Sequence, residues 1–378
     1  MLTDVALRAP LSAEVVLQQV FPLGSRAAQK MCSIHVIRQG AEPRWVIIGS
    51  PRKALPVLRS WAPWRASSRV QWSVVRGSAA LNALSTLPGV VNSSAALDSG
   101  YWRERLRVFP EEWSAVIHVG SPSHTRKAIV FLIENGKRVV GAGKVPLMPE
   151  SAAAILNEGA VLERLGHFDN VPKVLFRDFE RGVAAQSWLE GGPVSREFTE
   201  AHLELVSSLA EPKGSVKISD CQSELARGFE STDLPYDRTL LARGLDMLAY
   251  DKPLRAFIEH RDFAPWNLKW VRKGILGLLD WEWAVSKGLP WQDISRYFYL
   301  NDVHFKENGQ VWEEMGKNDL LLQYRRRFEI PNEAIAPLTM RYLLRELLME
   351  WEGGNRWLAD YAIRQIGALA AKVAPVSA

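Results

Sequence analysis

The stretch that decides the reading of this chain is FIEHRDFAPWNLKWVRKGILGLLDWEW, residues 257–283. It places Asn267 five residues after Asp262 and Asp280 thirteen residues after Asn267. An apolar run at 275–279 ends directly before Asp280. A carboxylate for a hydroxyl proton, followed by two oxygen ligands for magnesium, is the arrangement that phosphoryl transfer requires. The stretch therefore predicts a phosphoryl-transfer site.

The composition is that of a folded protein. The sequence is 47% hydrophobic and 24% charged. Its 378 residues are enough for two domains or for one two-lobed domain with an extension. No apolar run approaches the ~18 residues of a membrane span, and the N-terminal sequence lacks the apolar segment of a signal peptide. Cys32 and Cys221 fit no metal-binding spacing. We expect free thiols and a cytoplasmic location.

The net charge of +5 is unevenly distributed. Residues 1–110 contain 14 Lys and Arg against 5 Asp and Glu, a net charge of +9, whereas residues 111–378 carry −4. A basic segment of this kind is typical of a solvated face or of a contact with something anionic, such as a membrane surface, a polyanionic glycan or a partner. No nucleic-acid-binding motif is present, so we expect no nucleic-acid partner.

The sequence pattern of residues 1–110 predicts a small α+β module of unknown role. We expect strands at 31–39, 44–50 and 70–75, with a short helix that begins at Pro51. No catalytic constellation is found in this segment.

Residues 111–190 predict a second module that begins with a three-stranded antiparallel meander. The strands are expected at 113–120, 126–134 and 137–145, and Asn135-Gly136 is a strong hairpin signal. The polar loop 121–125, with Ser121 and Ser123, can lay backbone N–H groups over phosphates. A helix at 151–165 follows.

Lys144 lies on the third strand of this meander, and Glu158 lies on the helix after it. A strand lysine paired with a helix glutamate binds the α/β-phosphates in kinases. Glu163, on the same helix, is a rival partner for Lys144, and the sequence leaves the choice open.

The elements HRDFAPWN (260–267), LLDWE (278–282) and NEGAVLERL (157–165), together with Lys144, resemble the aminoglycoside phosphotransferase and choline kinase family of small-molecule kinases. The resemblance covers about residues 112–375. It implies an α+β fold of the two-lobed protein-kinase type. The antiparallel-sheet N-lobe would span 111–190 and the mainly helical C-lobe, with the catalytic loop and acceptor pocket, would span 191–378. The module at 1–110 is additional.

The resemblance also implies roles for single residues. Asp262 is expected to accept or orient the proton of the acceptor hydroxyl, and Asn267 and Asp280 are expected to bind Mg²⁺. Lys144 and Glu158 would serve the phosphates of ATP or GTP. His260 would support the loop, and Asp293 would brace it. The nucleotide base would meet a hinge formed by Gln186, Ser187, Trp188 and Leu189.

The stretch departs from the family at two positions. Arg261 stands where relatives usually have Gly, and we expect it to be a structural ion-pair donor or an anion contact. Ala264 stands where relatives often have His. A positive charge near the γ-phosphate must then come from elsewhere, and Lys269 is a candidate.

The sequence thus predicts an enzyme, a kinase that transfers the γ-phosphate of ATP or GTP with Mg²⁺ to a hydroxyl of a small molecule. The expected acceptor is a sugar, a glycan precursor or an amino alcohol. The alternatives are an aminoglycoside-type antibiotic phosphotransferase, a catalytically silent pseudokinase that serves as a scaffold, and a protein kinase. The short segment between Asp280 and Asp293 speaks against a long regulatory loop and hence against the protein kinase.

Overall fold

The structure is a computed structural model that describes residues 10–22, 29–61, 66–107, 109–123, 125–306 and 311–372. His124, in the predicted polar loop, lies outside these ranges. The chain divides into two compact units, Met1–Pro193 and Val194–Ala378. This division lies three residues from the predicted boundary between 190 and 191.

The first unit is built on one eight-stranded antiparallel sheet in the order β3-β1-β2-β4-β5-β6-β8-β7. Its strands are β1 (Gln29–Gln39), β2 (Glu42–Ile48), β3 (Val90–Asp98), β4 (Trp113–Val119), β5 (Lys127–Glu134), β6 (Arg138–Pro146), β7 (Val174–Asp178) and β8 (Val183–Gln186). The predicted meander is confirmed as β4, β5 and β6. Because β2 pairs with β4, the predicted boundary at residue 110 falls within one sheet.

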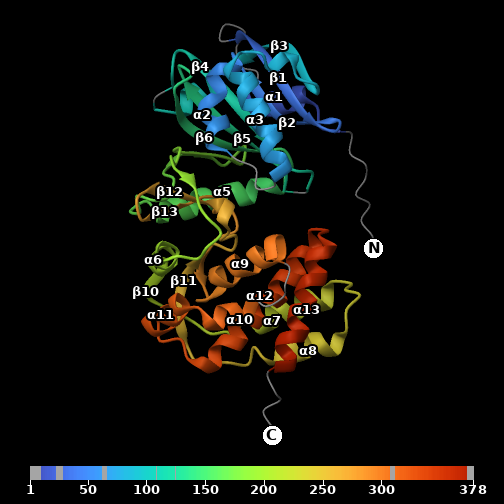
Figure 1. The fold of residues 1–378 in the computed structure, drawn as a ribbon, viewed down its shortest axis with the longest axis vertical. Helices are drawn as coiled ribbons and strands as arrows, with labels where there is room; N and C mark the ends of the chain where they lie inside the picture. The colour runs from blue at the N-terminus through green and yellow to red at the C-terminus, as the bar shows by residue number, and fades with distance from the viewer. Residues whose placement is uncertain are drawn as a thin grey trace. The chain divides into compact units, whose positions relative to one another are not determined.

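Helices pack against both faces of this sheet, and α1, α2 and α3 are labelled beside its strands in Figure 1. They are α1 (Ala13–Val20), α2 (Leu55–Ser60), α3 (Ala66–Ala80), α4 (Gly100–Arg105) and α5 (Ser151–Arg164), with short 3-10 turns at Pro51–Ala54 and Leu84–Thr86. Successive strand residues point to opposite faces. Ile117 accordingly joins a core with α1 and α4, whereas Val116 joins a core with α2 and α3.

The strand predicted at 70–75 is wrong, because these residues lie in α3. The alternation of VQWSVV fits a strand over six residues, but Trp72, Val75 and Ala79 also share one helical face. That face packs against the sheet. β3 was not predicted because its centre, Asn92-Ser93-Ser94, is polar and exposed, as an edge strand allows.

The second unit is mainly helical, and α12 and α13 lie side by side in it (Figure 1). Its helices are α6 (Glu200–Ser208), α7 (Gln222–Ser231), α8 (Arg238–Asp246), α9 (Gln292–Asn301), α10 (Val311–Lys317), α11 (Asp319–Arg327), α12 (Asn332–Glu352) and α13 (Arg356–Lys372). A π-helical turn, Asp302–Lys306, follows α9, and 3-10 turns occur at Ser219–Cys221 and Pro265–Asn267.

Short strands complete the chain: β9 (Gly192–Pro193) at the end of the first unit, and β10 (Ala210–Val216), β11 (Leu254–Glu259), β12 (Leu268–Arg272), β13 (Ile275–Leu278) and β14 (Val285–Gly288) in the second. The α+β class is confirmed, with an antiparallel-sheet N-terminal region and a helical C-terminal region. Cys32 and Cys221 are free thiols, as predicted. Over the described ranges, no helix has the length and apolar character needed to cross a bilayer.

Candidate active site

The predicted catalytic loop, residues 260–267, connects β11 to β12 in the second unit. Arg261 adopts a left-handed backbone conformation, with φ of 68°, two residues after Glu259, the last residue of β11. The Asp293 carboxylate accepts the backbone N–H groups of His260 and Arg261, each at 2.8 Å. Burial and the negative charge of Glu259 raise the pKa of Asp293 to about 7. Asp293 therefore holds the start of the loop, as predicted.

The His260 ring links the loop to the segment that carries Asp280. Its Nδ1 atom accepts the backbone N–H of Asp262 at 3.2 Å, and its Nε2–H donates to the carbonyl oxygen of Leu279 at 2.9 Å. An imidazole that accepts at one nitrogen and donates at the other is neutral. The two hydrogen bonds confirm that His260 supports the loop. That His260 is not the base stays a prediction.

Asp262 and Asn267 face each other across the loop. Asn267 Nδ2 donates to Asp262 Oδ2 at 2.8 Å and to the Asp262 carbonyl oxygen at 2.9 Å. Because both bonds come from the amide nitrogen, the amide oxygen of Asn267 keeps its lone pairs for another partner. The Asp262 side chain is 22% exposed, so a substrate can reach it.

Asp280 is brought to the loop by backbone hydrogen bonds. The N–H of Leu279 donates to the carbonyl oxygen of Asn267 at 2.9 Å, and His260 holds Leu279 from its carbonyl side. Asp280 itself has φ of 66°, a conformation that Asp tolerates better than most residues with a side chain. The second unit therefore gathers Asp262, Asn267 and Asp280 around one loop.

The Asn267 amide oxygen and the Asp280 carboxylate fit Mg²⁺ by their chemistry. Magnesium is usually held by one or two protein oxygens and completes its shell with water and phosphate oxygens. This donor set suits an ion that arrives with the phosphates of a nucleotide. A larger cluster, with three or more His, Cys, Asp or Glu placed to hold a metal, is not found among the described residues.

Arg296, on α9, is a site residue that the sequence analysis missed. Its Nη2 atom lies 3.1 Å from Asp262 Oδ1. The available signal was its spacing, because Arg296 lies one helical turn after Asp293 and so shares the helix face that meets the loop. Lys269 was the sequence-based candidate for the positive charge near the γ-phosphate. It lies on β12, where burial lowers its pKa to about 8.

Glu259, the last residue of β11, is buried among three guanidinium groups. Its Oε1 atom pairs with Arg261 (3.4 Å), Arg341 (3.2 Å) and Arg345. Burial alone would raise the pKa of Glu259, but the three positive charges outweigh it and lower the pKa to about 2. The expectation that Arg261 is a structural ion-pair donor is confirmed.

We expect Glu259→Gln to lower the free energy of unfolding at neutral pH by about 3–5 kcal/mol, the usual cost of removing one partner of a buried ion pair. The folded-state pKa of Glu259 lies below its ordinary value of 4.5, so its stabilisation is present above that pH and is lost as the pH falls towards 2. Urea unfolding over this range should show the gap between wild type and variant closing in acid. Glu333→Gln is the control, because the Glu333–Lys252 pair is exposed and should matter little. Equal losses in both variants would contradict the prediction.

The Lys144–Glu158 pair lies in the first unit. Lys144 Nζ is 2.5 Å from Glu158 Oε2, and both residues are buried, at 5% and 2% exposed. Glu163 instead pairs with Arg177 at 2.6 Å. The choice between the two glutamates is thereby decided. Glu158 lies on the helix face that carries the buried Leu162, whereas Glu163 faces outward.

The loop between β4 and β5 is held by two arginines. Arg44, on β2, donates to Ser121 Oγ at 3.2 Å, and Arg126 pairs with Glu42 at 2.9 Å. The carbonyl oxygen of Ser123 accepts the backbone N–H of Arg126 at 3.3 Å. Burial and the charge of Arg126 lower the pKa of Arg44. Sequence reasoning missed Arg44 because it comes from the N-terminal segment, 77 residues before Ser121.

The predicted hinge begins at Gln186, the last residue of β8. The N–H of Ser187 donates to the carbonyl oxygen of Lys173 at 2.7 Å, and Ser187 Oγ accepts the N–H of Lys173 at 2.9 Å. The Trp188 ring packs against the core that includes residues of α2 and α3, and Leu189 lies outside any helix or strand. The backbone N–H of Ser187 is therefore used within the unit.

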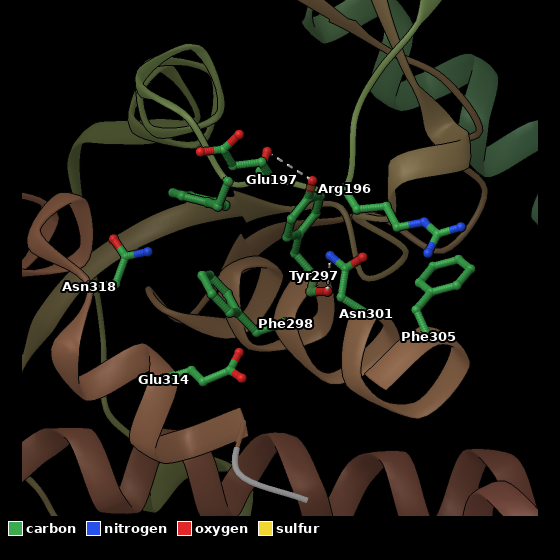
Figure 2. A pocket seen from close by; sticks show the side chains of 9 residues that line it. Arg196, Glu197, Tyr297, Phe298, Asn301, Phe305, Glu314 and Asn318 are labelled. Atoms are coloured by element: carbon green, nitrogen blue, oxygen red, sulfur yellow. Dashed lines mark hydrogen bonds between the residues drawn. The ribbon is translucent and has the colours of Figure 1, made fainter. Parts of the chain in front are cut away.

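A cavity of about 380 Å³ opens in the second unit (Figure 2). Figure 2 shows Arg196 over the Phe305 ring, at 3.5 Å from the ring centroid. The cavity combines aromatic rings, carboxylates and amides, and its lining residues are Arg196, Glu197, Phe198, Tyr297, Phe298, Asn301, Phe305, Glu314 and Asn318.

Two aromatic contacts connect the catalytic loop to this cavity. The Phe263 ring, next to Asp262, lies 5.7 Å from the Tyr297 ring of the lining. The Trp266 ring lies 5.6 Å from His304, the neighbour of Phe305. The cavity is therefore adjacent to the loop that carries Asp262.

No family model matches the chain, and no curated protein matches it. Among solved structures, a thermostable mutant of the aminoglycoside phosphotransferase APH(4)-Ia in complex with ADP and hygromycin B is similar at 14% identity and a TM-score of 0.47, over 69% of this chain and 95% of that one. The GDP and kanamycin complex of APH(2")-IIia is similar at 11% identity and a TM-score of 0.47, over 72% and 99%. The choline kinase LicA from Streptococcus pneumoniae is similar at 14% identity and a TM-score of 0.45, over 65% and 89%. Aminoglycoside phosphotransferases and a choline kinase are thus among the solved structures that this chain distantly resembles.

Proposed function

We propose that the protein is a phosphotransferase that moves the γ-phosphate of ATP or GTP, with Mg²⁺, to a hydroxyl group of a small molecule. The observation that carries the proposal is the arrangement of Asp262, Asn267 and Asp280 around one loop, with the Asp262 carboxylate accessible and hydrogen-bonded on both oxygens. A positioned carboxylate beside two magnesium-type oxygen donors suits phosphoryl transfer.

In the proposed reaction, Asp262 accepts the proton of the acceptor hydroxyl. The acceptor oxygen forms a bond to the γ-phosphorus while the bond to the β–γ bridging oxygen breaks, which leaves a nucleoside diphosphate. Magnesium, when bound, neutralises charge on the phosphates, and Asn267 and Asp280 would hold it. Transfer is direct, because the proposed site contains no His or Cys in a nucleophile setting.

The first unit is proposed to bind the nucleotide. Lys144, oriented by Glu158, would pair with the α/β-phosphates. The backbone of the loop with Ser121 and Ser123 would cover phosphates, and the segment Gln186, Ser187, Trp188 and Leu189 would meet the base. With Ser187 N–H already bonded to Lys173, polar backbone contacts to the base would come from its neighbours.

The acceptor is proposed to be a sugar, a glycan precursor or an amino alcohol bound in the cavity of Figure 2. Aromatic faces such as Phe298 suit the apolar face of a sugar or the methylene groups of an amino alcohol. The carboxylates of Glu197 and Glu314 can accept hydrogen bonds from hydroxyl or ammonium groups. Figure 2 shows Glu314 reaching towards Phe298.

A phosphorylation screen tests this function. Purified protein is incubated with Mg²⁺ and ATP or GTP, and with sugars, amino alcohols and aminoglycosides, and products are identified by mass spectrometry. Phosphorylated sugars or amino alcohols support the proposal. Phosphorylation of aminoglycosides alone would identify the antibiotic-modifying alternative. Tight nucleotide binding without turnover of any acceptor would favour the pseudokinase scaffold.

For an amino alcohol acceptor, we expect Glu314→Gln to raise KM roughly tenfold or more, because a charge-assisted hydrogen bond contributes about 1.5–3 kcal/mol. The KM for a neutral diol of the same shape should change little. Glu313→Gln is the matched control, since Glu313 lies next to it on α10 and pairs with Lys372 at 2.6 Å. Equal KM values for wild type and Glu314→Gln would remove Glu314 from the acceptor site.

Two further aspects belong to the proposal. The donor is a cytoplasmic nucleotide, so the proposed compartment is the cytoplasm. The +9 charge of residues 1–110 supports a peripheral contact with an anionic surface, which salt-dependent binding to vesicles with anionic lipids would test.

A further inference from the structure

Arg296 connects Asp262 to two glutamates on α12. Its guanidinium lies 3.1 Å from Asp262 Oδ1 through Nη2, and its Nη1 pairs with Glu346 and lies 3.8 Å from Glu350 Oε1. The Arg296 side chain is only 9% exposed, whereas that of Asp262 is 22% exposed. A substrate can therefore reach the carboxylate, while the arginine lies behind it.

Each carboxylate oxygen of Asp262 accepts a hydrogen bond from a different residue. Asn267 Nδ2 donates to Oδ2 at 2.8 Å, and Arg296 Nη2 donates to Oδ1 at 3.1 Å. A carboxylate bonded at both oxygens has one preferred rotation about its side-chain torsions. Loss of either donor frees that rotation.

Arg296 is in turn fixed from the other side. Glu346 is 0% exposed and the Arg296–Glu346 pair leaves the guanidinium little freedom. Burial alone would lower the pKa of Arg296, but the charge of Glu346 and its neighbours raises it well above its ordinary value. Burial and the charge of Glu346 raise the pKa of Glu350 to about 7. The Arg296 guanidinium thus stays positively charged, and its buried pair with Glu346 restricts its position.

Among the described residues, no basic side chain of the catalytic loop contacts the Asp262 carboxylate. Ala264 has no charge, and the Arg261 side chain pairs with Glu259. We infer that Arg296 is the positioning residue of this site: it fixes the Asp262 carboxylate against the acceptor hydroxyl. The inference rests on the proposed function and adds to it a link from α12 to the base.

The test compares Arg296→Met and Arg296→Lys with wild type in turnover of Mg-ATP and Mg-GTP, with water as the acceptor. Misplacing a reacting group by about 1 Å costs on the order of 100-fold, so kcat of Arg296→Met should fall about that much, with the nucleotide Kd unchanged. Arg296→Lys keeps the charge but not the two-pronged geometry, and should recover part of kcat. Arg105→Lys, which disturbs a pair with Asp178 in the first unit, should leave kcat unchanged.

Unchanged kcat in Arg296→Met, or a loss confined to nucleotide Kd, would overturn the inference. If the Met variant does not fold, Arg296→Lys carries the same measurement, with an unchanged kcat as the contrary result. A crystal structure of the folded variant provides a readout without turnover: Asp262 should leave its bond to Asn267, and an unmoved Asp262 overturns the inference. A wild type that turns over neither nucleotide with any acceptor refutes the proposed function instead, and the crystallographic readout still decides the role of Arg296.

Discussion

Asp262→Asn should reduce phosphoryl transfer by roughly 10²–10⁴-fold, the usual contribution of a positioned general base. The replacement keeps the size of the side chain, and its amide oxygen can still accept from Arg296. What it removes is the ability to accept the proton of the acceptor hydroxyl. Because the Asp262 side chain is not a proposed metal ligand, the affinity for Mg-nucleotide should stay within about twofold of wild type by the same argument.

The measurement pairs initial rates of nucleoside diphosphate release with calorimetric nucleotide binding. Asp251→Asn is the control, since Asp251 is an exposed residue just before β11. A turnover rate equal to that of wild type would remove Asp262 from the proposed base role. A variant that loses nucleotide binding and turnover together would point to a structural role for the carboxylate.

Asp280→Ala should abolish the magnesium-dependent part of nucleotide binding. Loss of an outer-shell partner already costs about 10–100-fold in metal affinity, and loss of a direct carboxylate ligand should cost at least as much. Binding of the nucleotide without Mg²⁺ should be the same in variant and wild type. Calorimetry with Mg-ATP, and with ATP in the presence of a chelator, separates the two contributions.

The backbone at Asp280 requires a second variant. With φ of 66°, Ala is strained by about 1–3 kcal/mol where Asp and Asn are tolerated better. Asp280→Asn keeps the conformation and one oxygen donor but loses the charge, and should show an intermediate loss. Unchanged Mg-ATP affinity in both variants would exclude Asp280 as a ligand, whatever the thermal stability of the Ala variant.

The sequence by itself determined the local parts of the site. The spacing of Asp262, Asn267 and Asp280 predicted that the three residues belong to one phosphoryl-transfer site. The Asn135-Gly136 turn predicted the β5–β6 hairpin. Such features depend on neighbours within about twenty residues, where turn chemistry and strand pairing leave few alternatives. The bracing roles of His260 and Asp293 were also accessible from the sequence, through the family resemblance.

Only the tertiary structure decided what distant segments bring together. Lys144 selects Glu158 over Glu163 because the rotation of α5 against the sheet buries one and exposes the other. The strands of residues 29–98 join the meander because β2 pairs with β4, whereas composition alone suggested a separate module. Arg296 reaches Asp262 because α9 is packed so that one of its faces meets the loop. Side-chain partners across long chain separations depend on packing, which local periodicity does not encode. For this protein, the sequence predicted Asp262 as the base and Asn267 and Asp280 as metal ligands, and only the tertiary fold placed the Arg296 guanidinium against Asp262.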